Sequence, residues 1–578
     1  MLKLAVYLKN YKKECILGPA FKFLEVIFEL LMPTIMALII NNGVARRDVG
    51  YVLGMGGLMI VLAVCGYGSA YICQRFASRA SQGFGTVLRN AVFARILGFS
   101  YAQIDRFGPP TLTNRITNDI NQLQQWVAMM IRLVSRAPFI CIGALVMSFI
   151  LDAKLALILL AATPVLAGII YFVTKYAAPL YRSYQKRLDH LAVILGENLS
   201  GVRVVRAFAK NRQETARFRR ANDELRDNGI AISRLSSLFN PMTSLVVNIV
   251  IVLILWFGGL RIDAGRLSQG QILAFINYVS QILVALLVVS NLIILLTKAM
   301  ASAMRVNEIL DTPPDMQAAD DKVIRLPDAS VPAIEFEGVS FGYNPTGERA
   351  LQDINVTIKR GETVGIIGGT GSGKTTFVHL IARFYDATEG VIRIDGVPVR
   401  EYPLEMLRKK IALVPQRVRL FTGTIAENIR WGNPQADMQA VRDAAQVAQA
   451  DEFIQNLPRQ YDAPVQRGGM NLSGGQRQRL SIARALVASA EILILDDASS
   501  ALDFLTDARL RKAIRRSSRT QTVLLVSQRV GVVKNADRII VLEDGEVAGV
   551  GTHDVLFETC ETYREIYLSQ ISAEEAQL

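Results

Sequence analysis

The chain of 578 residues has only five cysteines and three histidines. No two cysteines have the spacing of a metal-binding pair, and three of the five lie in apolar stretches. A disulfide framework is therefore not expected, and the prediction is reduced, structural thiols. We also expect no cleavable signal peptide, because the start reads as a short basic amphipathic segment.

Acidic residues are fewer than basic ones, 51 against 64, so the net charge is +13. Such an excess is typical either of cytoplasmic loops in a membrane protein or of a nucleic-acid binder. Here the basic residues lie largely between apolar stretches, and no basic patch interleaved with aromatic residues is present. The distribution favours a membrane protein, and no nucleic-acid partner is expected.

The composition combines features of membrane and soluble proteins. Hydrophobic residues make up 51% and mean hydropathy is +0.28, yet charged residues still make up 20%. The chain is also too long for a single hydrophobic core. A membrane domain joined to a soluble domain explains these observations together.

Six apolar stretches are long enough, or nearly so, to cross a bilayer as helices of about 20 residues. They are roughly Ile16–Ile40, Tyr51–Ile72, Met129–Leu151, Leu155–Tyr176, Leu238–Leu260 and Ile272–Leu296. Short segments join the first to the second, the third to the fourth and the fifth to the sixth. The segments after the second and the fourth are long, basic and helical in pattern. The positive-inside rule places these long segments, both termini and the second half in the cytoplasm.

Each long segment is expected to bend once, around residues 105–110 and again at Ser200-Gly201. Residues 2–14 are expected to form an elbow helix on the cytoplasmic membrane surface. Within the first span, Lys22, Glu25 and Glu29 have helical spacing, and pairing among themselves or with the elbow is favoured over a substrate site. Asn248, Asn277 and Asn291 face either a translocation path or neighbouring helices.

A polar, proline-containing stretch after about residue 310 marks a domain boundary. We predict a transmembrane domain over 1–310, a linker over 311–332 and a soluble domain over 333–578. In the soluble part, short apolar strands alternate with helices, which is typical of an α/β nucleotide-binding fold.

The strongest motif in the soluble part matches the P-loop pattern G-x-x-x-x-G-K-[ST]. It comprises Gly368, Gly369, Thr370, Gly371, Ser372, Gly373, Lys374 and Thr375, followed by Thr376. It lies between an apolar strand, Thr363–Ile367, and a helix expected over Thr376–Ala382. Backbone N–H groups of such a loop bind phosphate oxygens. Lys374 is expected to reach the β- and γ-phosphates of ATP, and Thr375 to bind Mg²⁺.

A second apolar strand, Ile492–Leu495, ends in Asp496-Asp497. A carboxylate at the end of such a strand, beside a P-loop, can hold Mg²⁺ directly or through water. Asp496 is the candidate for this role.

Between these motifs lies Leu472-Ser473-Gly474-Gly475-Gln476, and here the chain resembles the ATP-binding cassette family, whose signature this is. The resemblance covers nearly the whole chain, including a six-helix exporter fold and coupling helices at the two bends. It implies roles for residues across the cassette: Tyr343 stacking on adenine, Gln416 sensing Mg²⁺ and the γ-phosphate, Asp503 in the D-loop, and Ser473, Gly474, Gly475 and Gln476 as the signature. It also implies that two cassettes pair head to tail, each ATP lying between one P-loop and the other signature.

Two residues depart from the family pattern. Asp497 stands where the family usually has a glutamate acting as general base, and Gln528 stands where it has a switch histidine. Aspartate is one methylene shorter, and glutamine cannot take a positive charge. Gln466 also replaces a common glutamate before the signature. We predict that this chain's own site binds ATP but hydrolyses it slowly, whereas its signature completes a partner's active site.

The predicted protein is thus half of a heterodimeric exporter in a bacterial inner membrane, with a homodimer as the alternative. Its spans lack a dense charged cluster, which favours hydrophobic or amphipathic cargo such as drugs or lipids. Two other functions are compatible with the same fold: an importer, and a nucleotide-sensing regulator or channel. Transport direction is not determined by the sequence.

Overall fold

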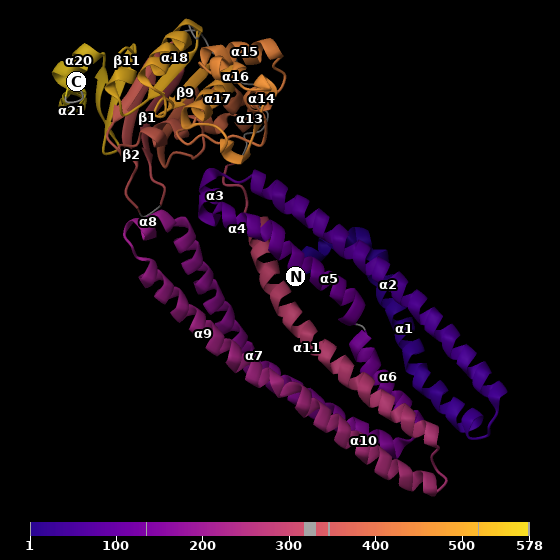
Figure 1. The fold of residues 1–578 in the computed structure, drawn as a ribbon. Coiled ribbons are helices and arrows are strands. Elements are labelled where there is room, and N and C mark those ends of the chain that lie inside the picture. Colours follow the sequence, from indigo (N-terminus) through magenta and orange to yellow (C-terminus); the bar gives the residue numbers. More distant parts are fainter. Residues whose placement is uncertain (1, 135, 317–330, 345–346, 518–519, 576–578) are drawn as a thin grey trace. The chain divides into compact units, whose positions relative to one another are not determined.

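The computed structural model describes residues 2–134, 136–316, 331–344, 347–517 and 520–575. Most of the expected linker, 311–332, lies outside these residues. The chain divides into two compact units (Figure 1). The first comprises Met1–Leu97 and Gly108–Pro313, and the second comprises Gly98–Phe107 and Pro314–Leu578.

The first unit consists of long helices joined by short turns (Figure 1). Its elements in chain order are η1 (Leu2–Tyr11), α1 (Lys12–Leu38), η2 (Ile39–Val44), α2 (Val49–Leu97), α4 (Pro109–Asn114), η3 (Arg115–Asp119), α5 (Ile120–Met129), η4 (Met130–Val134), α6 (Arg136–Leu151), α7 (Ala153–Ser200), α8 (Val202–Ala207), α9 (Asn211–Ser237), α10 (Phe239–Asp263) and α11 (Gln269–Asp311). Within the described residues, six helical stretches are long and apolar enough to cross a membrane, so the six predicted spans are confirmed.

Local sequence explains where these helices begin. Asp152 caps α7, its carboxylate accepting hydrogen bonds from the backbone N–H groups of Lys154 and Leu155, each at 3.0 Å. Ser268 and Gln271 form a reciprocal capping box at the start of α11. The helices continue well beyond the apolar stretches, because a helix needs no apolar residues once it leaves the bilayer. Helices end at Phe107 and at Ser200, each directly before a glycine, and these two breaks agree with the expected bends. A further break follows Leu97.

In the part of the second unit that the structure describes, the strands form three sheets, ordered β2-β1-β4-β5, β12-β11-β3-β10-β9-β6 and β7-β8. Their strands are β1 (Ile334–Phe341), β2 (Leu351–Ile358), β3 (Thr363–Gly368), β4 (Glu389–Ile394), β5 (Val397–Pro398), β6 (Ile411–Val414), β7 (Gly423–Thr424), β8 (Pro464–Val465), β9 (Ile492–Asp496), β10 (Thr522–Val526), β11 (Arg538–Glu543) and β12 (Glu546–Gly551). The α/β fold predicted for this half is confirmed.

Helices of the second unit cover and connect these sheets. They are α3 (Tyr101–Phe107), α12 (Lys374–Ile381), η5 (Val399–Glu401), α13 (Leu404–Lys410), α14 (Ile425–Arg430), α15 (Met438–Val447), α16 (Asp451–Gln455), η6 (Gln460–Asp462), η7 (Arg467–Gly469), α17 (Gly474–Val487), α18 (Phe504–Ser517), α19 (Val530–Val533), α20 (His553–Thr559) and α21 (Glu561–Glu575). Helix α12 begins at Lys374, two residues before the predicted start.

The central sheet determines where the functional residues meet. Strands β11, β3, β10, β9 and β6 run parallel, so their carboxyl ends share one edge. All five residues of β9 are buried, as expected for a strand covered on both faces. In parallel α/β sheets, ligands bind at this carboxyl edge.

Candidate nucleotide-binding site

A hollow of about 360 Å³ lies at the carboxyl edge of the central sheet. It contains residues from five separate parts of the cassette sequence. Its lining includes Tyr343, Ala350, Thr370, Gly371, Gly373, Lys374, Thr375, Thr376, Gln416, Asp496, Asp497, Val526, Ser527 and Gln528. The fold therefore brings together the P-loop, the two aspartates, Gln416 and Gln528.

Two glycines of the P-loop adopt left-handed backbone conformations, Gly371 with φ 87° and Gly373 with φ 93°. At Gly373 a side chain is excluded twice, because a Cβ atom there would lie 2.6 Å from Leu351 and 2.7 Å from the carbonyl oxygen of Ala350. This tight turn leads directly into α12. Its backbone N–H groups and the helix N-terminus make a phosphate-binding loop.

Lys374 is mostly buried, and its ammonium group donates to the carbonyl oxygens of Gly368 at 2.9 Å and Gly369 at 2.5 Å. A third bond, 3.1 Å long, reaches the hydroxyl oxygen of Ser372. Burial lowers the pKa of Lys374, while Asp496 and Asp497 act in the opposite direction. The lysine thus lies against the loop, within reach of phosphates bound there.

Asp496 carries an unused acceptor in the middle of the hollow. Its Oδ1 accepts a 3.3 Å hydrogen bond from the Thr375 hydroxyl, whereas its Oδ2 is buried without a hydrogen-bond partner. The residue is 1% exposed, and burial raises its pKa to about 6. A buried carboxylate oxygen beside a hydroxyl is a donor set that Mg²⁺ prefers, with the amide oxygen of Gln416 as a further oxygen ligand. These residues fit the metal expected from the sequence.

This unpartnered carboxylate leads to a stability prediction for the metal-free protein. Between the unfolded pKa near 4 and the native pKa near 6, the native chain holds more protons, so stability falls as pH rises. We expect Asp496→Asn to stabilise the metal-free cassette by about 1–2 kcal/mol at pH 7.5, or about 2–8 °C in Tm. At pH 5 the wild-type carboxyl is protonated and the difference should vanish.

Scanning calorimetry of the full-length protein in a metal chelator, at both pH values, measures this effect. Asp554→Asn, an exchange at the start of α20 outside the hollow, is the control: it removes a carboxylate that favours the helix N-terminus, so any change in Tm should be a small decrease and the same at both pH values. An Asp496→Asn protein that melts lower than wild type at pH 7.5 would contradict the prediction.

Asp497 is held by its backbone. Its φ of 46° lies in the left-handed region. Its backbone N–H donates to the carbonyl oxygen of Val526 at 2.9 Å. Its own carbonyl oxygen accepts from the Gln478 side-chain amide at 3.1 Å and from the backbone N–H of Ser500 at 3.2 Å. Burial raises the pKa of its carboxyl group, although Gln416 and Arg529 lower it. The backbone therefore cannot advance into the hollow to compensate for a short side chain.

Two glutamines that follow other strands of the central sheet also line this hollow, on either side of the strand that carries Asp496. Gln416 follows β6, and Gln528 follows β10. The carbonyl oxygen of Gln528 accepts a 2.7 Å bond from Gln570 on α21, which fixes its main chain. Tyr343 is half exposed and its hydroxyl pairs with that of Thr376 at 3.0 Å, so its ring is available at the rim.

The signature residues are not part of this hollow. Ser473 caps α17 through a capping box, in which the Gln476 amide oxygen accepts from the Ser473 N–H at 2.9 Å. Asp503 accepts from both the backbone N–H and the hydroxyl of Thr506, and these bonds lower its pKa. Neither the signature nor Asp503 lines the hollow that holds the P-loop. One chain alone thus presents the two halves of the expected site separately.

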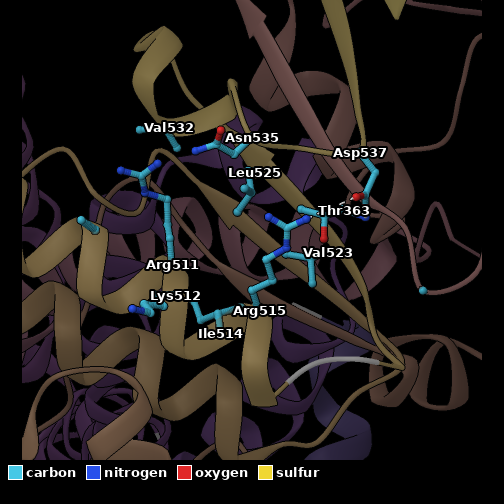
Figure 2. A pocket seen from close by; sticks show the side chains of 12 residues that line it. Thr363, Arg511, Lys512, Ile514, Arg515, Val523, Leu525, Val532, Asn535 and Asp537 are labelled. Atoms are coloured by element: carbon cyan, nitrogen blue, oxygen red, sulfur yellow. Dashed lines mark hydrogen bonds and ion pairs between the residues drawn. The ribbon is translucent and has the colours of Figure 1, made fainter. Parts of the chain in front are cut away.

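A larger hollow, about 470 Å³, lies elsewhere in the cassette (Figure 2). Its floor is apolar, formed by Ile514, Val523 and Leu525 among others, and Arg511 and Arg515 of α18 line it as well. It contains no residue of any motif identified in the sequence. Size alone therefore does not identify the nucleotide site.

The first bend of the long helical segments belongs structurally to the cassette unit. Helix α3 packs there, with the Tyr101 ring stacked on Phe384 at a centroid distance of 4.5 Å. The Tyr385 hydroxyl donates to Asp105 at 2.8 Å. Because α3 is joined by the chain directly to α2 and α4 of the other unit, it is a candidate element for transmitting movement between the two units. The second bend, α8, packs against α7 and α9.

We expect Tyr101→Ala to loosen α3 from the cassette, because an aromatic stack contributes about 0.5–1.5 kcal/mol. Amide hydrogen exchange within α3 should become about threefold to tenfold faster. Hydrogen–deuterium exchange of the full-length protein measures this effect. Tyr181→Ala, at an exposed tyrosine of α7, is the control and should leave the exchange of α3 unchanged. Unchanged exchange in Tyr101→Ala would contradict a contribution of the stack.

A P-loop at the carboxyl edge of a parallel sheet, joined to six membrane helices, defines a nucleotide-driven membrane transporter. Two family models match: the ABC transporter transmembrane region over residues 15–286, and the ABC transporter domain over residues 351–500. The chain belongs to the ABC transporter family and is a multi-pass integral membrane protein.

Relatives match along almost the whole chain. An uncharacterized ABC transporter ATP-binding protein of Mycobacterium tuberculosis is 37% identical over 571 residues, covering 98% of this chain and 97% of the relative. The ABC transporter ATP-binding protein YfiB of Bacillus subtilis is 37% identical over 577 residues, with complete coverage of both. An ATP-dependent lipid A-core flippase of Chromobacterium violaceum is 30% identical over 578 residues, covering 99% and 98%.

A solved structure has the same fold. The structure of a bacterial Atm1-family ABC exporter with ATP bound matches with a TM-score of 0.77 and 23% identity, covering 98% of each chain. The exporter fold predicted from the sequence is confirmed.

Proposed function

We propose that this chain is one half of an ATP-driven exporter of hydrophobic or amphipathic compounds, and that it works with a different half-transporter. Its own P-loop binds ATP and Mg²⁺ but hydrolyses ATP slowly. Its signature completes the active site built on the partner's P-loop. The proposal includes a bacterial inner-membrane location with the cassette and both termini in the cytoplasm.

The observation that carries this proposal is the mixture of residues in one hollow. An intact P-loop with Lys374 and an unpartnered Asp496 oxygen lies beside Asp497 and Gln528, which replace the usual base and switch residues. A hollow that keeps its binding groups and loses its catalytic groups is suited to holding nucleotide. The N-terminus of the signature helix α17 carries backbone N–H groups that suit a partner's phosphate.

In the proposed cycle, each residue has a defined task. Backbone N–H groups of residues 369–375 and the Lys374 ammonium hold the phosphates, and Thr375, Asp496 and Gln416 hold Mg²⁺, which neutralises phosphate charge when bound. Asp497 is placed as a weak base for the attacking water. Pairing of two cassettes around the phosphates drives the membrane half from one orientation to the other, and hydrolysis at the partner's site lets the cassettes separate.

Lys374→Ala tests the asymmetry. In the complex with its partner, this substitution should leave much more ATP turnover than the equivalent lysine substitution in the partner. The measurement is ATPase activity of the reconstituted pair. Equal loss of activity from both substitutions, or brisk hydrolysis by a complex of this chain with itself, would contradict the heterodimer and support the homodimer.

Export rather than import is favoured by the fold, and cargo of a lipid type is favoured by the flippase relatives. Inverted vesicles decide direction, because an exporter accumulates cargo inside them. Single-channel recording with the same preparation distinguishes a transporter from a gated channel: ATP-dependent conductance steps would contradict the transporter proposal.

A further inference from the structure

Within the membrane unit, a charged pair lies where the sequence suggested none. Glu29 of α1 was expected to pair with its own helix or the elbow. Instead its carboxylate accepts from the Arg136 guanidinium of α6, with two contacts of 3.0 Å. The neighbouring Lys22 and Glu25 do pair with each other, at 2.7 Å. Glu29 and Arg136 are 107 positions apart, so only packing of α1 against α6 joins them.

This pair lies within the thickness of a bilayer. Glu29 precedes the end of its helical stretch at Val44, and Arg136 precedes the end of α6 at Leu151, each by about 22 Å at 1.5 Å per residue. The hydrocarbon core is about 30 Å thick. Charges at such a depth are costly, face the protein interior or a cavity, and mark functional sites by default.

Two hollows meet at the pair. One, about 200 Å³, is lined by Glu29 and Arg136 together with Asn277, Ser280 and Gln281 of α11. The other, about 310 Å³, is lined by the same pair, by Glu25, whose carboxylate is paired with Lys22, and by apolar side chains of α1 and α2. The ion pair is therefore accessible from both sides rather than enclosed in the core.

Hydrogen-bonding capacity around the first hollow is incomplete. The Nε of Arg136 and the amide oxygen of Gln281 are both buried without a partner. Asn277 donates to the carbonyl of Leu273 at 2.9 Å, which leaves its amide oxygen with no bond recorded among the described residues. An unused donor and unused acceptors that lie around one hollow are complementary to a ligand carrying both kinds of group.

Apart from the polar residues of α11 in the first hollow and the paired Glu25 in the second, the walls of the two hollows are apolar. They include Ala137, Ile140, Val284, Ala285 and Val288 in the first, and Phe28, Met32, Leu62 and Tyr67 in the second. A ligand that reaches the pair thus places its apolar part against these residues. The hollows fit an amphipathic molecule, its polar group at the charged pair.

We propose that Glu29, Arg136 and Gln281 form the headgroup site for a zwitterionic amphiphile. The pair supplies one carboxylate and one guanidinium, so a headgroup with one cationic and one anionic group satisfies both and adds no net charge. Because Glu29 and Arg136 neutralise each other, a ligand with a net charge would bring an uncompensated charge into a low-dielectric region. This assignment rests on the proposed transport function and names its class of cargo.

Position within the fold supports access to this site. Tyr278 is fully buried and its hydroxyl donates to the carbonyl of Leu30 at 2.9 Å, which fixes α11 on α1. Asn277 and Ser280, its neighbours on α11, are exposed. The Tyr278–Leu30 hydrogen bond therefore fixes α11 so that its polar residues Asn277 and Ser280 remain exposed beside the ion pair.

The test is direct binding to the full-length protein in detergent, followed by native mass spectrometry. The probes share one acyl or alkyl chain length and carry N–H donors on their cationic groups: lysophosphatidylethanolamine as zwitterion, lysophosphatidylglycerol as anion and an alkylammonium as cation. We expect the zwitterion to bind wild type most tightly. Glu29→Gln and Arg136→Gln should each weaken its binding about tenfold, as expected for loss of a charge-assisted hydrogen bond.

Two further variants keep this test decisive. Gln281→Leu removes the unpartnered amide without breaking the ion pair, and should weaken zwitterion binding about threefold even if the charged variants fail to fold. Arg261→Gln breaks a different interhelical pair, with Asp152 at 2.5 Å, whose residues line neither hollow. It should leave binding unchanged.

Binding of all three probes unaffected by Glu29→Gln, Arg136→Gln and Gln281→Leu would overturn the site. Tighter binding of the cation, lost in Glu29→Gln but strengthened in Arg136→Gln, would overturn the zwitterion assignment, and so would the converse pattern for the anion. Failure of the transport proposal has a different signature: no probe would accumulate in inverted vesicles although the binding differences remain.

Discussion

Exchanging Asp497 for glutamate and Gln528 for histidine together is expected to raise ATP turnover at this chain's own site by about 10²-fold. A positioned general base contributes about 10²–10⁴ in rate when it is within hydrogen-bond reach. Because hydrogen bonds to Val526, Gln478 and Ser500 fix the backbone of Asp497, the missing methylene is not regained by movement of the main chain. A histidine at 528 adds a group that can donate and carry positive charge.

The measurement is steady-state ATPase activity of the reconstituted complex whose partner site has been inactivated. Asp554→Glu, the same lengthening of a carboxylate outside the hollow, is the control. A wild-type rate already equal to that of the double variant would contradict the proposal that this chain's own site hydrolyses ATP slowly because of Asp497 and Gln528. A double variant that remains slow would contradict it as well.

The second large effect is expected from Gly474→Asp in the signature. A Cβ atom at this glycine would meet the Ala501 side chain at 3.6 Å, an ordinary contact, so the change fits the fold. It places a carboxylate in the first turn of α17, where backbone N–H groups would meet the partner's ATP phosphate. Repulsion between the two anions should lower turnover of the complex by more than about 10²-fold, since a helix N-terminus then no longer favours the phosphate.

Gly474→Ala is the matched control, because it adds the same Cβ atom without charge and should retain most activity. Nucleotide binding at this chain's own P-loop, measured with a fluorescent ATP analogue in the isolated subunit, should be unchanged in both variants. Equal effects of alanine and aspartate would show that shape, rather than charge, matters at this position, and would contradict the proposed role.

Several features of the site were predictable because their determinants are contiguous in sequence. The P-loop is read from eight consecutive residues, and Asp496 follows directly on a buried apolar run. Gln416 and Gln528 also follow strands, so their meeting at one edge was predictable once those strands run parallel. Helix α12 begins two residues earlier than predicted, because Gly373 in its left-handed conformation already starts the turn.

Other features depend on contacts between distant residues. Nothing near Glu29 in sequence indicates Arg136, and the helical spacing of Glu29 with Lys22 and Glu25 instead favoured pairing among these three residues or with the elbow. The ends of the apolar stretches mark the bilayer boundary and not the helix ends, so the predicted spans are shorter than the helices. Of the three asparagines considered for a translocation path, Asn277 lines a hollow, whereas Asn248 and Asn291 are exposed and line neither hollow beside the ion pair.

The sequence by itself determined the class of this protein, the chemistry of its nucleotide loop and the two substitutions that set its catalytic site apart, because motifs and apolar runs are local. Only the tertiary structure decided that Asp496 keeps an unpartnered oxygen, that α3 packs with the cassette, and that a carboxylate and a guanidinium meet within the membrane unit. Burial and pairing are properties of surfaces brought together by folding, and sequence spacing does not encode them.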